Sequence, residues 1–428
     1  MFLGAIRARV VVCVPTPVLR ATQQLYRLRG IGQARTMKPH DLNLADPAFS
    51  TRSPEVAQAR AAHWCARTPF GIAVLRHREA GMLLRDRRLR QGSHAWPETV
   101  GLEGEFADFW TGSIIAKEGA DHKRLRGLFQ GAMRDDDIAA LIPKFRASAA
   151  ELITPMLDRD ADFMAAFALP FAGQALCHVL GLPGSDWPRV AEDAATLGMA
   201  MGVDAKRHEP SVNAACARLF ALADTLISAA EAGQPGFVGR LLAAADGVDR
   251  KDVRNLIVIS MFGGVDTTRS QLGHAVALFL DHPEQWSALK TDTTRIDAAV
   301  EDMIRAYPTT TWATREALED FAFGGMEIAK GETVHVLVHA SAMDPALDGG
   351  SGFDVTAKRR SHFGFGGGAH HCLGAAIARA DMAAALEEIL ARVARFSPAG
   401  TPHFRPDSGN TSPIVLPIHA HGPKSSAT

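Results

Sequence analysis

The chain contains the run Phe363-Gly364-Phe365-Gly366-Gly367-Gly368-Ala369-His370-His371-Cys372-Leu373-Gly374, which decides its predicted fold. Four glycines and one thiol come before the segment 373–379, which reads as the start of an amphipathic helix. A cysteine at the start of a helix lies near the positive end of the helix dipole, which favours the thiolate over the thiol. Because glycines lack Cβ atoms, a flat ligand can lie against their backbone. The run therefore predicts an axial cysteine ligand for iron.

Three other interpretations of this run stay open on the residues alone. The pattern Gly364-x-Gly366-x-x-Ala369 is similar to a dinucleotide-binding loop, but segment 356–362 is too polar for the buried strand that such a loop follows. The neighbouring side chains of residues 370–372 include zinc-ligand types, but adjacent positions lack the usual ligand spacing. The third interpretation is a structural glycine loop with a buried cysteine.

The run resembles the haem-binding signature of the cytochrome P450 family. The match is Phe365-x-x-Gly368-x-x-x-Cys372-x-Gly374, and Gly366 and His370 also stand where bacterial members carry them. The resemblance implies a mostly α fold with a small β region in a single large domain. It also implies haem b (iron protoporphyrin IX), with the Cys372 thiolate as the axial iron ligand.

Length and composition agree with a large helical body. The chain has 428 residues, 47% of them apolar and 22% charged, and no linker, repeat or low-complexity block divides its middle. The net charge of −1 gives no overall field that would attract nucleic acid. The five cysteines are scattered and odd in number, which is typical of a reducing, cytoplasmic compartment.

The first 36 residues differ from the rest of the chain. No Asp or Glu occurs before Asp41, whereas six arginines do, and the apolar run 10–14 is too short to span a membrane. The segment is either a targeting peptide or an extension from a start codon placed too early, and we favour the extension, with Met37 as the true beginning. We expect a poorly ordered leader at 1–36, a haem domain at 37–420 and a C-terminal tail at 421–428.

A long central helix is predicted for about 251–280. The stretch 256–262 is apolar nearly all round, and the helix should end before Pro283. Inside it stand Gly263, Gly264, Asp266 and Thr267. Glycines cost a helix about 1 kcal/mol each relative to alanine, and a buried acid adds a desolvation cost. Such departures from local preference are expected at functional sites.

These four residues are similar to the distal-helix motif of the P450 family. The resemblance implies that the glycines open the helix where dioxygen binds, that Thr267 hydrogen-bonds the activated dioxygen, and that Asp266 gates protons toward it. In the alternative interpretation, the threonine bonds back to its own helix and Asp266 pairs with an internal charge.

Four side chains resemble the family's ligands for the haem propionates. His122 and Arg126 stand at i and i+4 of a predicted helix, so two cationic donors share one face. The resemblance adds Arg315 and His370. Any exposed basic helix could carry a similar His-x-x-x-Arg pattern.

One departure from the family concerns a core ion pair. The family has Glu-x-x-Arg, whereas this chain has Asp302 three residues before Arg305 and Glu301 four residues before it. We expect the Asp302–Arg305 contact to survive. Because aspartate is one methylene shorter, we also expect Asp302→Glu to raise stability or haem retention.

The implied reaction is insertion of one atom of dioxygen into a hydrophobic organic substrate, a hydroxylation. The resemblance implies electrons from a separate ferredoxin and ferredoxin reductase, with NAD(P)H as the ultimate donor, and we expect a monomer without a membrane span.

Basic residues on the thiolate side are either a docking surface for an acidic carrier or ordinary solvated charge: Lys123, Arg124, Lys358, Arg359 and Arg360. Candidate substrate-lining residues by position are Ile259, Met261, Phe262, Thr311, Trp312 and Ser412. Two other functions stay open, a peroxide-dependent haem-thiolate peroxygenase and a non-catalytic haem-binding protein.

Overall fold

The computed structural model describes residues 39–201, 205–347, 352–358, 361–407 and 409–423. Residues from Pro39 onward form one contact unit. The expected leader 1–36 lies outside the described residues, as do Arg359 and Arg360. The predictions that concern these segments therefore stay predictions.

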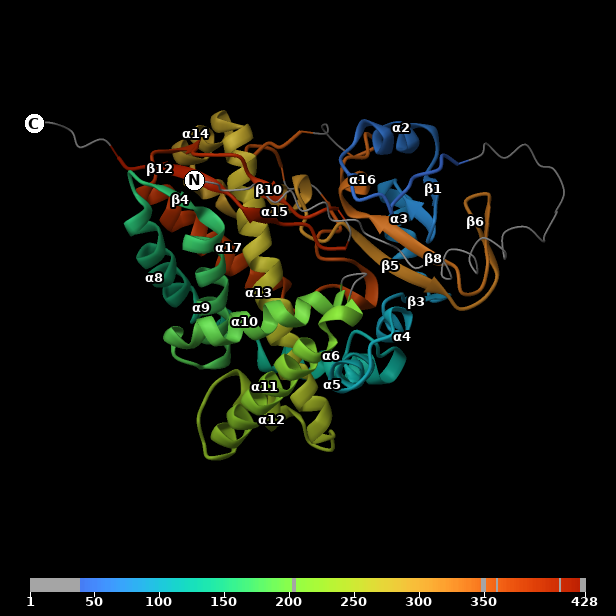
Figure 1. Ribbon diagram of the computed structural model, residues 1–428, viewed down its shortest axis with the longest axis horizontal. Coiled ribbons are helices and arrows are strands. Elements are labelled where there is room, and N and C mark those ends of the chain that lie inside the picture. Colours follow the sequence, from blue (N-terminus) through green and yellow to red (C-terminus); the bar gives the residue numbers. More distant parts are fainter. Residues whose placement is uncertain (1–38, 202–204, 348–351, 359–360, 408, 424–428) are drawn as a thin grey trace, which may run out of the picture. The chain divides into compact units, whose positions relative to one another are not determined.

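The described residues are mostly helical, with four small sheets, which confirms the predicted fold class (Figure 1). The α-helices are α2 (Pro54–Ala62), α3 (His77–Leu83), α4 (Trp96–Val100), α5 (Glu105–Gly112), α6 (Gly119–Ala132), α7 (Asp135–Ala139), α8 (Ile142–Ile153), α9 (Leu169–Leu180), α10 (Trp187–Gly198), α11 (Ala205–Glu231), α12 (Phe237–Ala244), α13 (Arg250–Asp281), α14 (Pro283–Thr291), α15 (Ile296–Ala306), α16 (Val338–Ala342) and α17 (Ala375–Arg392). The strands are β1 (Cys65–Thr68), β2 (Gly71–Val74), β3 (Leu89–Gln91), β4 (Asp160–Asp162), β5 (Trp312–Ala317), β6 (Phe321–Phe323), β7 (Met326–Ile328), β8 (Thr333–Leu337), β9 (Arg395–Pro398), β10 (His403–Phe404), β11 (Pro413–Val415) and β12 (Pro417–His421).

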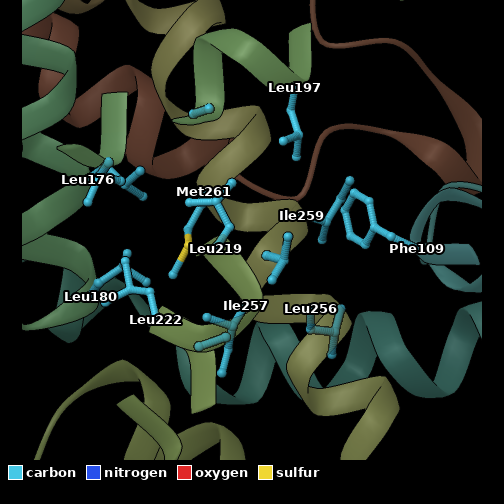
Figure 2. Packing of buried hydrophobic residues seen from close by; sticks show 14 of the residues in the cluster. Phe109, Leu176, Leu180, Leu197, Leu219, Leu222, Leu256, Ile257, Ile259 and Met261 are labelled. Carbon is cyan, nitrogen blue, oxygen red and sulfur yellow. The ribbon is translucent and has the colours of Figure 1, made fainter. Parts of the chain in front are cut away.

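Helix α13 is the predicted central helix. It begins after Asp249, whose side chain accepts a hydrogen bond from the Lys251 amide at 2.8 Å, and it ends before Pro283. It packs against α9, α10 and α11. Figure 2 shows Leu256, Ile257, Ile259 and Met261 of α13 in an apolar cluster that also contains Leu176, Leu180, Leu219 and Leu222. Burial is interrupted in the middle of α13, where Gly263 is exposed.

The largest sheet positions one of the predicted haem ligands. Its strand order is β1-β2-β8-β5-β3, with β2 and β8 parallel and the other pairs antiparallel. Strand β5 is internal, and its Arg315 pairs with Val334 on one side and with Gln91 on the other. In Figure 1 this sheet lies apart from helices α8 and α9. Arg315 is therefore positioned by a strand that is paired on both sides.

Helix α17 follows the glycine-rich run and anchors it to the helical core. It packs against α8 and α15. Its buried residues Met382, Leu386 and Ile389 belong to a cluster that also contains Phe163 and Met303. The loop before α17 is thereby tied to the centre of the molecule.

Helix α11 is long and apolar enough to cross a membrane by length and composition, and it is the one such helix among the described residues. Its apolar side chains pack inside the protein, because Val212, Cys216 and Leu219 are buried in the core cluster that also contains residues of α13. We therefore interpret α11 as a core helix.

Candidate active site

The loop before Cys372 has a conformation that the surrounding protein fixes. The amide of Cys372 donates to the carbonyl of Phe365 at 2.9 Å. Gly368 has a φ of +69°, and a Cβ atom there would lie 2.1 Å from the backbone oxygen of Leu84. A side chain at this position would have to move the neighbouring backbone, so glycine is required.

Cys372 lies three residues before Ala375, the first residue of α17. Its side chain keeps contact with solvent, although protein surrounds most of it. This burial raises the pKa of the Cys372 thiol, and the opposing effects of the Gly374 amide, Arg126 and Arg379 do not outweigh it. The amide at the helix start does favour the thiolate, as predicted, but burial outweighs its effect among the protein groups alone. A metal ion at the sulfur is what would favour the anion here.

Two arginines hold the loop that precedes Cys372. Nη1 of Arg126, on α6, donates to the carbonyl of His371 at 2.6 Å. Nη2 of Arg315, on β5, donates to the carbonyl of Gly367 at 3.0 Å. Arg126 and Arg315, which the sequence analysis assigned to the haem propionates, thus come from separate elements and meet at one loop.

The two predicted histidine ligands lie in contact. The ring centroids of His122 and His370 are 4.2 Å apart, and Nε2 of His370 lies 3.0 Å from a carboxylate oxygen of Glu118. Burial, followed by the nearby His370, lowers the pKa of His122 to about 4. Among the protein groups alone, His122 is therefore mainly neutral at pH 7.

The polar residues of α13 adopt the alternative arrangement of the sequence analysis. The Thr267 hydroxyl donates to the carbonyl of Gly263 at 2.7 Å. Asp266 accepts hydrogen bonds from Arg269 at 2.7 Å and from Arg405 at 3.3 Å. Gly263 and Gly264 lie within the continuous helix α13, and the expected opening at these glycines stays a prediction. A threonine hydroxyl can share the carbonyl of the fourth residue before it without breaking the helix, which explains the difference.

The side chains and spaces around Cys372 fit a haem. A Cβ atom added at Gly263 or at Gly374 would meet no heavy atom within 4 Å, so open space adjoins both residues. The accessible thiol supplies a ligand type that haem iron accepts. Two arginines and two histidines gather at the same loop, as two propionate groups require.

The Asp302–Arg305 pair is present and buried. The two Asp302 oxygens lie 2.6 and 3.2 Å from Nε and Nη2 of Arg305, a bidentate arrangement. Asp302 also accepts a hydrogen bond from the Asp354 amide at 2.8 Å. The shorter acid reaches its partner fully, so the structure removes the reason for expecting a gain from Asp302→Glu.

The neighbouring Glu301 serves a second buried cluster rather than Arg305. Its carboxylate pairs with Arg379 and lies 3.1 Å from Nε2 of His362. Burial acts to raise the pKa of Glu301, but hydrogen bonds with His362 and Arg379 outweigh this and hold it far below the ordinary value. The Arg379 guanidinium also lies over the Phe365 ring, 4.4 Å from its centroid. This cluster therefore supports the Cys372 loop directly.

The candidate substrate residues fall into two groups. Met261, Thr311 and Ser412 are fully buried, and both hydroxyls are hydrogen-bonded to backbone carbonyls. These three do not border open space. Phe262 is partly accessible and packs edge-on against Trp110, while Ile259 is nearly buried and Trp312 is partly accessible.

Sequence reasoning missed several residues of the site. Arg269 stands three residues after Asp266, so helical spacing could have identified it. Arg379 lies on the predicted helix after Cys372, but its partner Glu301 is distant in sequence. Glu118 stands four residues before His122, so helical spacing could have identified it, whereas only the tertiary structure brings Arg405 to the site.

Comparison with known proteins identifies the family. No protein-family model matched the chain. Luteothin monooxygenase of Streptomyces thioluteus is 35% identical over 389 residues, covering 88% of this chain and 95% of that protein. A biotin biosynthesis cytochrome P450 of Bacillus subtilis is 25% identical, covering 81% and 90% of the two chains. The structure of cytochrome P450 CYP109Q5 from Chondromyces apiculatus superposes with a TM-score of 0.78 at 22% identity, covering 90% and 99%.

The fold and the site thus define a haem-thiolate class of protein, and the chain belongs to the cytochrome P450 family. It is a monooxygenase, and its cofactor is haem.

Proposed function

We propose that this protein hydroxylates a hydrophobic organic substrate with one atom of dioxygen, using haem b bound through the Cys372 sulfur. The observation that carries this proposal is an accessible thiol that follows a loop whose Gly367 and His371 carbonyls accept hydrogen bonds from Arg315 and Arg126. When bound, haem supplies the redox chemistry that activates dioxygen. The names of the relatives support the reaction class, since they include a hydroxylase/epoxidase and other monooxygenases.

The protein groups around Cys372 would bind and orient the haem. Arg126 and Arg315 would donate to the propionate oxygens, with His122 and His370 as further donors. Arg126 and Arg315 already donate to loop carbonyls, so haem binding would redirect part of their hydrogen bonding. Gly366 and Gly374 would leave room for the porphyrin, whereas the space beside Gly368 is filled by the Leu84 backbone.

On the opposite side, Thr267 and Asp266 would handle protons. The Thr267 hydroxyl can rotate away from the Gly263 carbonyl and donate to an oxygen atom in the open space beside Gly263. Asp266 is tied to Arg269 and Arg405, so release of one arginine would free it to exchange protons with solvent. Delivery of protons by this pair is the role that we assign to it.

The substrate side of the site would be apolar. Phe262 is the best-placed candidate for a substrate contact, and we also propose Ile259 and Trp312 as substrate contacts. An aromatic and aliphatic lining suits an apolar ligand of moderate size, and such linings are common to ligand pockets.

We infer that electrons arrive from a ferredoxin and its NAD(P)H-dependent reductase in the cytoplasm, with the enzyme as a monomer. Lys123 and Lys358 are exposed, whereas Arg124 pairs with Asp252 at 2.9 Å. Ferredoxin-supported turnover should fall steeply as salt rises from about 50 to 500 mM, since exposed charges are screened. A flat salt profile would exclude electrostatic docking.

The absorption spectrum of the reduced, carbon monoxide-bound protein tests the proposal. We expect a thiolate-type spectrum from the parent and its loss in Cys372→Ser. Cys216→Ala is the matched control, because that buried thiol lies in the α11 core and its removal should leave the spectrum unchanged. Purified parent protein that stays colourless after haem supplementation, or that gives a histidine-type spectrum, would refute the proposal. Turnover with hydrogen peroxide alone, without ferredoxin, would indicate the peroxygenase instead.

A further inference from the structure

Two histidines and an aspartate meet at the C-terminal strand, away from the haem ligands described above. His419 and His421 stand at alternate positions of β12, so both side chains lie on the same face of the strand. Their ring centroids are 4.3 Å apart. Asp158 precedes β4, which pairs with β12 and lies beside it in Figure 1. One ligand atom from each of the three residues lies within 4.8 Å of the others.

The backbone holds Asp158 against β12. Its amide donates to the carbonyl of Ala420 at 2.8 Å. Asp158 is also the one non-glycine residue with positive φ in the described part of the chain, at 56°. Aspartate tolerates this left-handed conformation better than most residues do. The carboxylate is therefore held at a defined place beside the two histidines.

Each of the three side chains has one polar atom engaged with a neighbour. Nδ1 of His419 lies 2.6 Å from a carboxylate oxygen of Asp160, and Nε2 of His421 lies 2.8 Å from the Ser397 hydroxyl. Oδ1 of Asp158 accepts a hydrogen bond from the Gly422 amide at 2.9 Å. Nε2 of His419, Nδ1 of His421 and Oδ2 of Asp158 remain for a ligand. Metal-binding histidines usually have their second nitrogen held by a carboxylate or a similar group in this way.

We propose that Asp158, His419 and His421 bind a divalent transition-metal ion of the zinc class. Two imidazoles and one carboxylate suit zinc, nickel or copper, whereas magnesium and calcium prefer oxygen ligands. Arg395 on β9 pairs with His421 in the sheet and opposes a cation, but the carboxylates of Asp158 and Asp160 offset its charge. The bound ion would join β12 to the segment before β4, and three protein ligands leave a fourth position for water.

Isothermal calorimetry with zinc chloride tests the site on tag-free, haem-loaded full-length protein. The parent should bind one zinc ion per chain and should not respond to magnesium. His419→Ala and His421→Ala should each weaken zinc binding at least about tenfold, and Asp160→Asn should weaken it about tenfold because it frees the His419 ring. His403→Ala, which removes an exposed histidine of β10, should bind zinc as the parent does.

Circular dichroism and the haem absorption band confirm that each variant is folded. Zinc should also raise the melting temperature of the parent and of His403→Ala, but not that of the double variant H419A/H421A. Parent protein that binds no stoichiometric zinc overturns the proposal. So does equal zinc affinity in the parent, His419→Ala and His421→Ala, because binding would then lie elsewhere on the surface.

Discussion

The Cys372 loop and the middle of α13 both contain adjacent glycines, but glycine has a different purpose in each. In the loop, Gly368 has a positive φ and lies against the Leu84 backbone, so the protein itself excludes a side chain. In the helix, Gly263 has ordinary helical geometry, and a Cβ atom there would meet nothing within 4 Å. A glycine in a helix interior costs stability, and no protein atom requires this one.

The Cys372 loop is thus a part of the site whose conformation the fold determines, whereas Gly263 borders space that no protein atom fills. The loop is held by Arg126, Arg315 and the Glu301 cluster before any ligand binds. The polar groups of α13 bond to their own helix and to two arginines, so they can exchange partners. We therefore call the thiol side the scaffold, because contacts between separate elements hold it, and we call the α13 side the adjustable side, because its hydroxyl bonds within its own helix.

The largest loss of unfolding free energy is expected when the buried Asp302 carboxylate of the scaffold is removed. Asp302→Ala leaves the fully buried Arg305 without its carboxylate partner, which should cost about 3–5 kcal/mol of unfolding free energy. Denaturant unfolding of the variant and the parent measures it. Asp302→Glu is the control, and it should cost about 1–3 kcal/mol because the bidentate pair leaves no room for another methylene. A variant with glutamate that is more stable than the parent would show that the aspartate is too short.

Alanine at the two kinds of glycine tests the comparison directly. Gly368→Ala should destabilise the protein by about 2–4 kcal/mol, because it combines a positive φ with a backbone clash. Gly263→Ala should instead stabilise haem-free protein by about 0.5–1 kcal/mol. The same change should lower turnover of the haem-loaded enzyme if the space beside Gly263 belongs to the reaction. Equal destabilisation by both changes would remove the distinction between the two regions.

Acid should weaken the scaffold through Glu301. Its folded-state pKa is depressed by His362 and Arg379, which outweigh the effect of burial, so the unfolded chain binds the proton more tightly. The stability that it contributes is complete above the ordinary value of 4.5 and decreases as pH falls below it. Unfolding free energies measured from pH 7 to pH 3.5 should therefore fall less steeply in Glu301→Gln. Parallel curves for the two proteins would contradict this assignment.

The smallest effect on stability is expected from the adjustable side. Thr267→Ala should leave folding and the haem spectrum nearly unchanged, while the fraction of consumed dioxygen that appears as product falls at least about tenfold. Ser260→Ala is matched to it, because that hydroxyl also bonds to the carbonyl four residues earlier on α13. Product formed per dioxygen should be unchanged in the control. Unchanged coupling in Thr267→Ala would remove this hydroxyl from proton delivery.

The sequence by itself determined the fold class, the long helix around Gly263 and the family of the chain. These rest on local patterns, since the Cys372 run and the periodicity of α13 each lie within one short segment. It also predicted the Asp302–Arg305 contact, because residues three apart on a helix are neighbours.

Only the tertiary structure decided how the charged groups pair. Arg405 meets Asp266, Glu118 meets His370, and Arg379 takes Glu301, all across long stretches of chain. It also showed that burial outweighs the helix start at the Cys372 thiol and that the Thr267 hydroxyl bonds within its helix. Desolvation and long-range pairing depend on what packs around a side chain, and a linear pattern does not contain that information.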